Sequence, residues 1–518
     1  MTRARWLIHA VLVVALLCTA PRTWSSEPVA GVDELVASLL KEGGAPGLAL
    51  VIVKDDAVIA ARGYGTRTLG AKDAVDADTL FGIASLTKAF TATALGILVD
   101  GNQIRFDDTL AAAMPGFRVA DPYVTAHLTL RDALSHRTGT ATADLLWYAR
   151  PNSNPAALVE RLGALPQSAS LRERFGYSNL MYIVAGELLA RRSGVTWEQF
   201  VAKEILTPLD MTRSSVELSK LAAIPNVATP HIRSGASIVP VPHDDHRNVG
   251  PSGAIYSSAN DLGRWLRFLL NDGELEGRRL IKRETLAQTM TPQMLIGPTG
   301  PADELLFPGA NFIAYGMGWF VSDYRGHKTL SHTGSIDGMA AFISLLPEQR
   351  LGVAVLSNLE GDMARAVIRN WIFDRYLQVA DSDWRASYSQ WNDAIRAHRA
   401  GMAKAQLDAR ATGTRPSLPL ARYAGRFAND LLGPVEVRLG AAGQLEWRLA
   451  DLPFAPLAHW HYDSFRIQWP TAAMNEPPFS LLSFQLGADG RAARVVVSGP
   501  MLAEDAVFDT DDRQSGGQ

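Results

Sequence analysis

The stretch Ser85-Leu86-Thr87-Lys88 places a hydroxyl and an amine three residues apart, directly after the apolar run Phe81-Gly82-Ile83-Ala84. Residues at positions i and i+3 share one face of a helix, so the amine of Lys88 can lie beside the hydroxyl of Ser85 and assist its deprotonation. An activated serine of this kind is the nucleophile that acyl transfer needs. The spacing alone is not selective, because Ser38-Leu39-Leu40-Lys41 repeats it inside a segment with helical apolar periodicity.

Two further triplets distinguish the first match from the second. Tyr177-Ser178-Asn179 is the only Y-x-N triplet among the twelve tyrosines, and His332-Thr333-Gly334 is the only H-x-G triplet among the eleven histidines. The chain therefore carries S-x-x-K early, Y-x-N in the middle and a basic-x-G triplet late. This order favours Ser85 over Ser38 as the nucleophile.

The same order resembles the penicillin-recognising serine hydrolases, whose motifs are S-x-x-K, S-D-N and K-T-G. The branch with class C β-lactamases and related peptidases and esterases has Tyr in the middle motif, and many of its non-lactamase members have His in the last. The resemblance covers roughly residues 32–377. It implies an antiparallel sheet flanked by helices, a helical subdomain, and an active site between them.

The resemblance also implies a role for each motif residue. Ser85 attacks, and a cationic Lys88 stabilises the phenolate of Tyr177, which makes Tyr177 the predicted general base. Asn179 is expected to bind both Lys88 and the substrate amide. The N–H groups of Ser85 and Ser335 are the expected oxyanion donors, and Gly334 is expected to let the substrate approach the strand.

The histidine at position 332 bears on the substrate. Lysine suits a substrate carboxylate, whereas histidine is mostly neutral above pH ~6.5. We therefore expect His332 and Thr333 to contact an uncharged substrate of a peptidase, amidase or esterase, bound as a small molecule or a peptide. A class C-like β-lactamase and a penicillin-binding sensor without turnover are the alternatives. A second departure is Leu171-Arg172-Glu173-Arg174, where relatives often have Pro-Gly.

The surrounding pattern predicts an α+β fold. An amphipathic helix over 32–41 precedes a hairpin of strands at 48–53 and 58–61. Mostly helical segments follow from 107 to about 218, and strand patterns return at 317–320, 330–332, 341–344 and 353–356. Strands from both ends of this region are expected to share one sheet.

The rest of the chain predicts a second domain. Helices at 363–377 and 384–410 lead to a linker at 413–416, so that residues 378–416 form a helical linker. Short strands separated by turn residues then fill 417–509, which is typical of a small all-β barrel or sandwich. Tyr423-Ala424-Gly425-Arg426-Phe427 resembles the start of a lipocalin-like domain.

The N-terminus is typical of a secretory signal peptide over residues 1–25. Arg3 and Arg5 precede an apolar run from 11 to 17 that is too short to span a bilayer, which takes ~20 residues. The mature chain is thus expected to be periplasmic or secreted, without a stable membrane span. The single cysteine, Cys18, follows Leu17 rather than a small residue, which disfavours a lipid anchor.

Composition excludes other classes of partner. The formal charge is −3 and no basic cluster is present, so nucleic-acid binding is not expected. His243-Asp244-Asp245-His246 could suggest a metal site, but no further ligand cluster accompanies it in the sequence, and a solvated loop is the favoured interpretation. No metal and no organic cofactor is expected.

Overall fold

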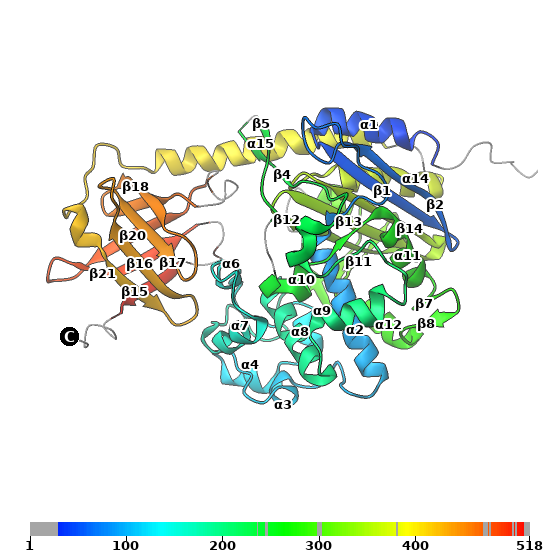
Figure 1. The fold of residues 1–518 in the computed structure, drawn as a ribbon, viewed down its shortest axis with the longest axis horizontal. Helices are drawn as coiled ribbons and strands as arrows, with labels where there is room; N and C mark the ends of the chain where they lie inside the picture. Colours follow the sequence, from blue (N-terminus) through cyan, green and yellow to red (C-terminus); the bar gives the residue numbers. More distant parts are fainter. Residues whose placement is uncertain are drawn as a thin grey trace, which may run out of the picture.

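The computed structural model describes residues 29–235, 237–243, 247–297, 303–379, 382–469, 475, 478–499, 502 and 505–511. The segment predicted to be a signal peptide, including Cys18, lies outside these residues. Figure 1 shows two bodies: a larger N-terminal domain and a smaller β-barrel, joined by the long helix α15 (Trp384–Asp408). The predicted α+β fold with a C-terminal all-β domain is confirmed.

One eight-stranded antiparallel sheet forms the centre of the N-terminal domain, in the order β2-β1-β14-β13-β12-β11-β10-β9. The first strands pair with the last ones, since β1 lies against β14 with Leu48 opposite Ser357. Strands from both ends of the domain therefore share one sheet, as predicted. The bounds are β1 Gly47–Lys54, β2 Ala57–Gly65, β9 Met294–Ile296, β10 Ile313–Tyr315, β11 Phe320–Tyr324, β12 His327–Ile336, β13 Met339–Leu346 and β14 Leu351–Ser357.

The strand expected over 317–320 is wrong in detail. Met317, Gly318 and Trp319 make the connection between β10 and β11, and only Phe320 begins a strand. Gly318 has φ +83°, and a Cβ there would lie 2.8 Å from the carbonyl oxygen of Lys88. The backbone needs glycine here because this connection packs directly on the helix that carries Lys88.

Helices cover both faces of the sheet. The amphipathic helix α1 (Val32–Gly43) packs with α14 (Ala364–Tyr376) over one face, where its apolar residues Val32, Val36 and Leu39 join a buried cluster. The other face carries α2 (Thr87–Asp100) and α11 (Ala259–Leu270). The sheet is therefore buried on both faces and forms the core of the domain.

The middle of the chain forms a helical subdomain beside the sheet, at the lower centre of Figure 1. Apart from α8, its helices are at most seven residues long, and several begin at a polar side-chain cap, such as Asp121 before α4 and Thr129 before α5. They are α3 Leu110–Ala113, α4 Pro122–His127, α5 Leu130–Leu134, α6 Leu145–Tyr148, α7 Pro155–Arg161, α8 Asn179–Ser193, α9 Trp197–Val201 and α10 Gly250–Gly253. A small hairpin of β4 (His231–Ser234) and β5 (Ser237–Pro240) precedes α10. Two further helices, α12 (Arg283–Thr289) and α13 (Asp303–Leu306), come before β9 and β10 of the sheet.

The C-terminal domain is a closed antiparallel barrel of eight strands. Its interior is packed with large side chains such as Trp447, Phe465 and Phe484, so side chains fill it. The strands are β15 Gly425–Asn429, β16 Gly433–Leu439, β17 Leu445–Leu449, β18 Ala455–His461, β19 Ser464–Ile467, β20 Leu481–Leu486, β21 Ala492–Ser498 and β22 Ala506–Thr510.

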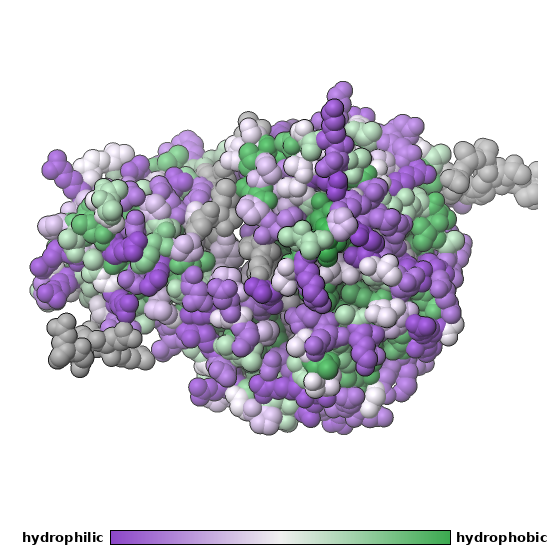
Figure 2. Space-filling view, in the orientation of Figure 1, coloured by the Kyte–Doolittle hydropathy of each residue, from purple (hydrophilic) through white to green (hydrophobic). Residues whose placement is uncertain are grey.

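The visible surface is mixed. Figure 2 shows hydrophilic residues spread over both domains on this face, with smaller hydrophobic patches between them. Among the described residues, no helix is both long enough and apolar enough to cross a bilayer. The large hydrophobic side chains that are exposed, such as Tyr123 and Leu295, are single residues at distant points of the chain.

Candidate active site

Ser85 lies in a strained turn at the start of α2. Residues Ala84–Leu86 form a short 3₁₀ turn, and α2 begins at Thr87. Ala84 has φ +47°, a left-handed conformation that is unfavourable for a residue with a Cβ. Strain of this kind collects at functional sites, where the surrounding structure holds it in place. Here a backbone hydrogen bond holds the residue before the turn, since the N–H of Ile83 donates to the carbonyl of Ile255 over 2.9 Å.

Gly334 of β12 packs against the turn that carries Ser85. A Cβ at Gly334 would lie 2.2 Å from the carbonyl oxygen of Ile83 and 3.2 Å from the Cβ of Ala84. The missing side chain is therefore needed by the protein's own nucleophile turn, which packs against the strand at this point. This differs from the expectation that Gly334 makes room for the substrate.

Lys88 is fully buried and has three partners. Its Nζ lies 3.0 Å from Ser85 Oγ, 2.8 Å from Asn179 Oδ1 and 2.9 Å from the carbonyl oxygen of Ser252. Burial lowers the pKa of Lys88 to about 7, although the negative charge of Asp144 acts in the opposite direction. A large fraction of Lys88 is therefore the neutral amine at neutral pH.

The partners of Lys88 also orient that neutral amine. The carbonyl of Ser252 can only accept a hydrogen bond, and so can Asn179 Oδ1. The orientation of the Asn179 amide is fixed, since its Nδ2 lies 3.2 Å from a carboxylate oxygen of Asp144. In the neutral form of Lys88, two N–H bonds serve these two acceptors and the lone pair faces Ser85 Oγ, whereas the charged form donates to Ser85 Oγ as well.

Tyr177 has the opposite electrostatic character to the one the sequence predicted. Burial raises the pKa of Tyr177 well above its usual range, with Asp144 acting in the same direction and a hydrogen bond with Ser85 opposing both. Lys88 Nζ is 4.7 Å from the centroid of the Tyr177 ring, but its presence does not lower the pKa of the phenol toward neutral pH. The raised pKa of Tyr177 favours the protonated phenol, and the lowered pKa of Lys88 favours the neutral amine, so these directions favour Lys88 as the base.

Asn179 and Asp144 form a pair that the sequence did not indicate. Asn179 was expected to bind the substrate amide through its side chain, yet its Nδ2 donates to Asp144. Asp144 also accepts from Trp147 Nε1 over 2.9 Å. An isolated aspartate before a short helix has no distinguishing sequence pattern, so only the fold could identify Asp144 as part of the site.

His332 lies behind the site rather than in it. The ring is 1% exposed, its Nε2 lies 2.7 Å from Tyr315 Oη, and its Nδ1 lies 2.6 Å from the carbonyl of Thr333. Because a carbonyl only accepts, Nδ1 carries the proton and Nε2 accepts from Tyr315. Burial, together with the charge of Lys88, lowers the pKa of His332 to about 3. The imidazole is neutral, as expected, but the expected contact of His332 with substrate does not match this position.

The remaining residues of the last motif differ in exposure. Thr333 is half-buried within β12 and pairs with Phe342 on β13. Ser335 is exposed and lines the same cavity as Ser85, so its N–H remains the predicted second oxyanion donor. In the β12 motif the side chain of His332 is thus buried against Tyr315, while Ser335 lies at the cavity.

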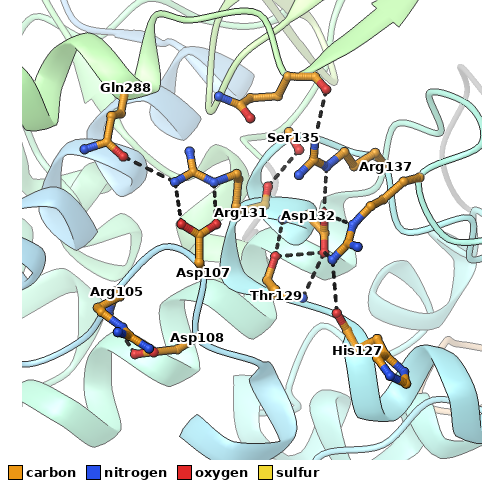
Figure 3. Close-up of polar contacts among 12 residues, drawn as sticks. Arg105, Asp107, Asp108, His127, Thr129, Arg131, Asp132, Ser135, Arg137 and Gln288 are labelled. Carbon is orange, nitrogen blue, oxygen red and sulfur yellow. Dashed lines mark hydrogen bonds and ion pairs between the residues drawn. The ribbon is translucent and has the colours of Figure 1, made fainter.

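A buried carboxylate organises the segment that leads to Tyr177. Asp132 is fully buried and accepts from Arg137 Nε over 2.6 Å and from the N–H of Thr129 over 3.0 Å, as Figure 3 shows. Arg172 completes the arrangement with Nη2 2.8 Å from Asp132. Burial raises the pKa of Asp132, but the hydrogen bonds from Arg172 and Thr129 and the charge of Arg137 together outweigh it, and the net pKa lies below its usual range. Arg172 thus has a specific partner where relatives often have Pro-Gly.

His136 joins this segment to the active site. Its carbonyl accepts from the N–H of Gly176 over 2.8 Å, and its Nδ1 accepts from the N–H of Ser178 over 3.1 Å. The His136 ring lies 4.3 Å from the ring of Tyr177. Burial lowers its pKa well below the usual range, so it is neutral. Sequence reasoning missed His136, which fixes the backbone on both sides of Tyr177.

The cavity at Ser85 is small and carries no positive side chain at its wall. It has a volume of about 150 Å³. Among the described residues that line it there is neither lysine nor arginine, and the one charged residue is Asp337. The others are Ala84, Ser85, Trp147, Tyr148, Asn179, Val249, Ser252, Gly253, Ser335 and Ile336.

The loop at residues 243–246, for which a solvated loop was favoured over a metal site, is only partly described. His243 Nδ1 lies 3.3 Å from Tyr256 Oη, and Asp244, Asp245 and His246 lie outside the described residues. Within the described part of the chain, no three histidine, cysteine or acidic side chains gather closely enough to hold a metal.

Comparison with known proteins places the chain in a family. The family model named Beta-lactamase matches residues 32–375, so this chain belongs to the Beta-lactamase family. A second model, described as a domain of unknown function (DUF3471), matches residues 409–515, which include the barrel.

Several curated proteins are similar. The "Unguisins hydrolase ungD" of Aspergillus violaceofuscus is 29% identical over 448 residues, covering 80% of this chain and 78% of the relative. "Penicillin-binding protein 4" of Amycolatopsis lactamdurans is 29% identical over 331 residues, covering 63% of this chain and 84% of the relative. The family and these names support a hydrolase.

A solved structure shares the fold of the whole chain. The octameric penicillin-binding protein homologue from Pyrococcus abyssi superposes with a TM-score of 0.60 at 21% identity, covering 93% of this chain and 99% of that one. The arrangement of an antiparallel sheet, helices and a C-terminal β domain is therefore one already known.

Proposed function

We propose that this protein is a serine hydrolase that cleaves amide or ester bonds through an acyl-Ser85 intermediate, as a peptidase, amidase or esterase. The observation that carries the proposal is the orientation of Lys88. Asn179 Oδ1 and the Ser252 carbonyl accept the two N–H bonds of the neutral amine, so that the lone pair of Lys88 Nζ faces the hydroxyl of Ser85. A base with a pKa near 7 is well matched to neutral pH.

The proposed acylation step uses this arrangement directly. Ser85 Oγ attacks the substrate carbonyl carbon while its proton passes to Lys88 Nζ. The N–H groups of Ser85 and Ser335 stabilise the oxyanion. As the bond to the leaving group breaks, Tyr177 gives its hydroxyl proton to the leaving nitrogen or oxygen and takes one from Lys88. Water then attacks the acyl-enzyme in the same way and restores Ser85.

The charge of the cavity supports uncharged or amine-bearing substrates. Asp337 at the wall and Asp144 beside Asn179 are both acidic, and no lysine or arginine is among the described lining residues. A substrate carboxylate would lack a cation to bind it. For this reason we place peptides, amides and esters before β-lactams.

Steady-state kinetics with three substrate types would test this function. We expect kcat/KM for a p-nitrophenyl ester or a D-amino-acid amide to exceed that for a cephalosporin, and an acyl adduct on the Ser85 peptide in mass spectra. Faster cleavage of the cephalosporin would favour a β-lactamase. A stable penicillin adduct without turnover of any substrate would favour the sensor function.

We further propose that the protein acts in the periplasm or after secretion. The support is the charged and then apolar order of residues 1–25. Fractionation of expressing cells, with N-terminal sequencing of the product, would test it. An intact N-terminus in the cytoplasmic fraction would contradict it.

A further inference from the structure

The barrel contacts the N-terminal domain next to the wall of the active-site cavity. Arg150 Nη2 donates to the carbonyl of Leu432 over 2.5 Å, and Arg161 Nε donates to the carbonyl of Leu431 over 2.8 Å. From the other side, the N–H of Asp451 donates to the carbonyl of Ala149 over 3.1 Å. We call these three hydrogen bonds the barrel clamp. In Figure 1 the helix α6, which ends at Tyr148, lies beside the barrel.

The barrel side of the clamp has a defined shape. Asn429 Oδ1 accepts from the N–H groups of both Leu431 and Leu432, which turns their carbonyls outward. Gly433 follows with φ +81°, and a Cβ there would lie 2.1 Å from Arg150 Nη2. The absence of a side chain at residue 433 therefore leaves room for the guanidinium of Arg150, and a Cβ there would displace it.

Arg150 is buried between the N-terminal domain and the barrel. The residue is 7% exposed. Burial lowers its pKa to about 10, the charge of Arg161 adds to this, and Asp451 opposes it. A buried cation needs hydrogen bonds to remain stable, and the barrel carbonyl of Leu432 supplies one. The N-terminal domain alone would present this side chain without that partner.

A second link joins Arg150 to the catalytic groups. Asn248 is 2% exposed, and its Nδ2 donates to the carbonyls of Arg150 over 2.8 Å and Trp147 over 2.7 Å. The next residue, Val249, lines the cavity, and so does Ser252, whose carbonyl accepts from Lys88. Trp147 and Tyr148 line it as well. The barrel clamp and Asn248 thus hold one wall of the cavity between them.

The barrel is also held at its far side, so its position does not depend on the clamp alone. Gln406 near the end of α15 accepts from the N–H of Phe479 over 2.7 Å and donates to its carbonyl over 2.9 Å. Arg410 Nε donates to the carbonyl of Trp460 over 2.7 Å. With two attachment points, the barrel can act as a fixed support for the helix α6.

We propose that the barrel is a specificity element of the hydrolase, and that the clamp positions the cavity wall of Trp147, Tyr148 and Val249 through Arg150 and Asn248. Arg150 and Asn248 are positioning residues that touch no reacting atom. The specificity part of this proposal rests on the function proposed above. The positioning part does not, because it concerns the order of residues 145–150 and 248–253 whatever the substrate.

A matched pair of glycine variants would test the proposal in the full-length protein. Gly433→Ala pushes the guanidinium of Arg150 off the Leu432 carbonyl. Gly443→Ala is the control, since Gly443 also has a positive φ, +73°, but a Cβ there meets nothing within 4 Å. Both carry similar backbone strain in the same barrel, and only Gly433 contacts the clamp. Arg150→Met, which keeps an unbranched stem, gives the same test from the other side.

Hydrogen exchange measured by mass spectrometry should show faster exchange in peptides covering 145–150 and 248–253 for Gly433→Ala and Arg150→Met, with no change for Gly443→Ala. The ratio of kcat/KM between a bulky and a small acyl ester should change by roughly 10- to 100-fold in the first two variants, mainly through KM. Unchanged exchange in both variants would overturn the positioning role. Faster exchange with an unchanged ratio would overturn the specificity role.

The exchange result separates this proposal from the hydrolase function itself. If the wild-type protein cleaves no ester or amide, the proposed function fails, while the exchange of 145–150 still decides whether the barrel orders the wall.

Discussion

Two stretches of this chain have the same Ser-x-x-Lys spacing, and they have little else in common. Ser38 and Lys41 lie on the outer face of α1, whose buried residues include Leu35, Val36 and Leu39. Ser38 Oγ donates to Glu42 Oε1 on the next turn over 3.0 Å, and Lys41 is exposed. Ser38 is thus half-buried with a carboxylate as its partner, and Lys41 is open to solvent.

Ser85 and Lys88 sit instead at the junction of the sheet, the helical subdomain and α10. Lys88 is fully buried, and its partners Asn179 and Ser252 lie 91 and 164 residues away in the sequence. The strained turn at Ala84 is held by β12 and by Ile255. A hydroxyl and an amine on one helix face become a nucleophile and a base only where desolvation changes the amine and acceptors direct its lone pair.

The largest expected difference between the two stretches is in the nucleophiles. Ser85→Ala should lower kcat by on the order of 10⁶-fold, because it removes the hydroxyl that lies 3.0 Å from Lys88 Nζ. Ser38→Ala, the matched control, should leave kcat unchanged. Ester hydrolysis and labelling by a fluorophosphonate probe measure both. Activity that survives in the first variant and is lost in the second would reverse the assignment.

The next effect concerns the amines. Lys88→Met should lower kcat by roughly 10⁴-fold, since the base is lost while the shape of the side chain is retained. Lys41→Met should have no effect, because Lys41 is exposed at the surface. If Lys88→Met keeps more than a tenth of the activity, another group takes the proton of Ser85, and Tyr177 would be the first to examine.

Tyr177→Phe should have a smaller effect, roughly 10²-fold in kcat. Tyr177 is proposed as a proton donor to the leaving group, and an activated ester with a good leaving group needs little help of this kind. We therefore expect the loss to be larger for an amide than for a p-nitrophenyl ester. An equal loss for both substrates would instead indicate that Tyr177 acts on Ser85.

The pH dependence provides the finest test. Burial lowers the pKa of Lys88 to about 7, so the amine is neutral, and able to act as a base, only above that pH. We expect kcat/KM to rise with pH and to level off above about 7, falling about tenfold per pH unit on the acidic side. A rise centred near pH ~10, the ordinary range of a lysine, would mean that Lys88 is not desolvated as the structure indicates.

Much of the fold could be predicted from local pattern. The spacing of Leu35, Val36 and Leu39 predicts α1, and the two apolar runs at 48–53 and 58–61 predict the first hairpin. The helices α14 and α15 also begin within a residue of the predicted positions. The run at 317–320 was assigned wrongly, because a connection packed on Lys88 is as apolar as a strand and only its φ values distinguish it.

The candidate site could be predicted only in part. Ser85, Lys88, Tyr177 and Asn179 come together, whereas His332 lies behind Tyr315. Asp144, His136 and Asn248 carry no recognisable spacing, because each acts on residues far away in the chain. Their roles arise from hydrogen bonds that no local pattern encodes.

Local pattern is enough to predict the order of the motifs, the secondary structure with strong periodicity and a second, β-rich domain, because these depend on neighbouring residues. The folded chain adds the burial that distinguishes Ser85 and Lys88 from Ser38 and Lys41, the opposite pKa shifts of Lys88 and Tyr177, and the contact of the barrel with Arg150 next to the cavity wall. A pKa depends on desolvation and on charges brought from distant segments, and a contact between domains depends on both surfaces. Neither exists until the chain is folded.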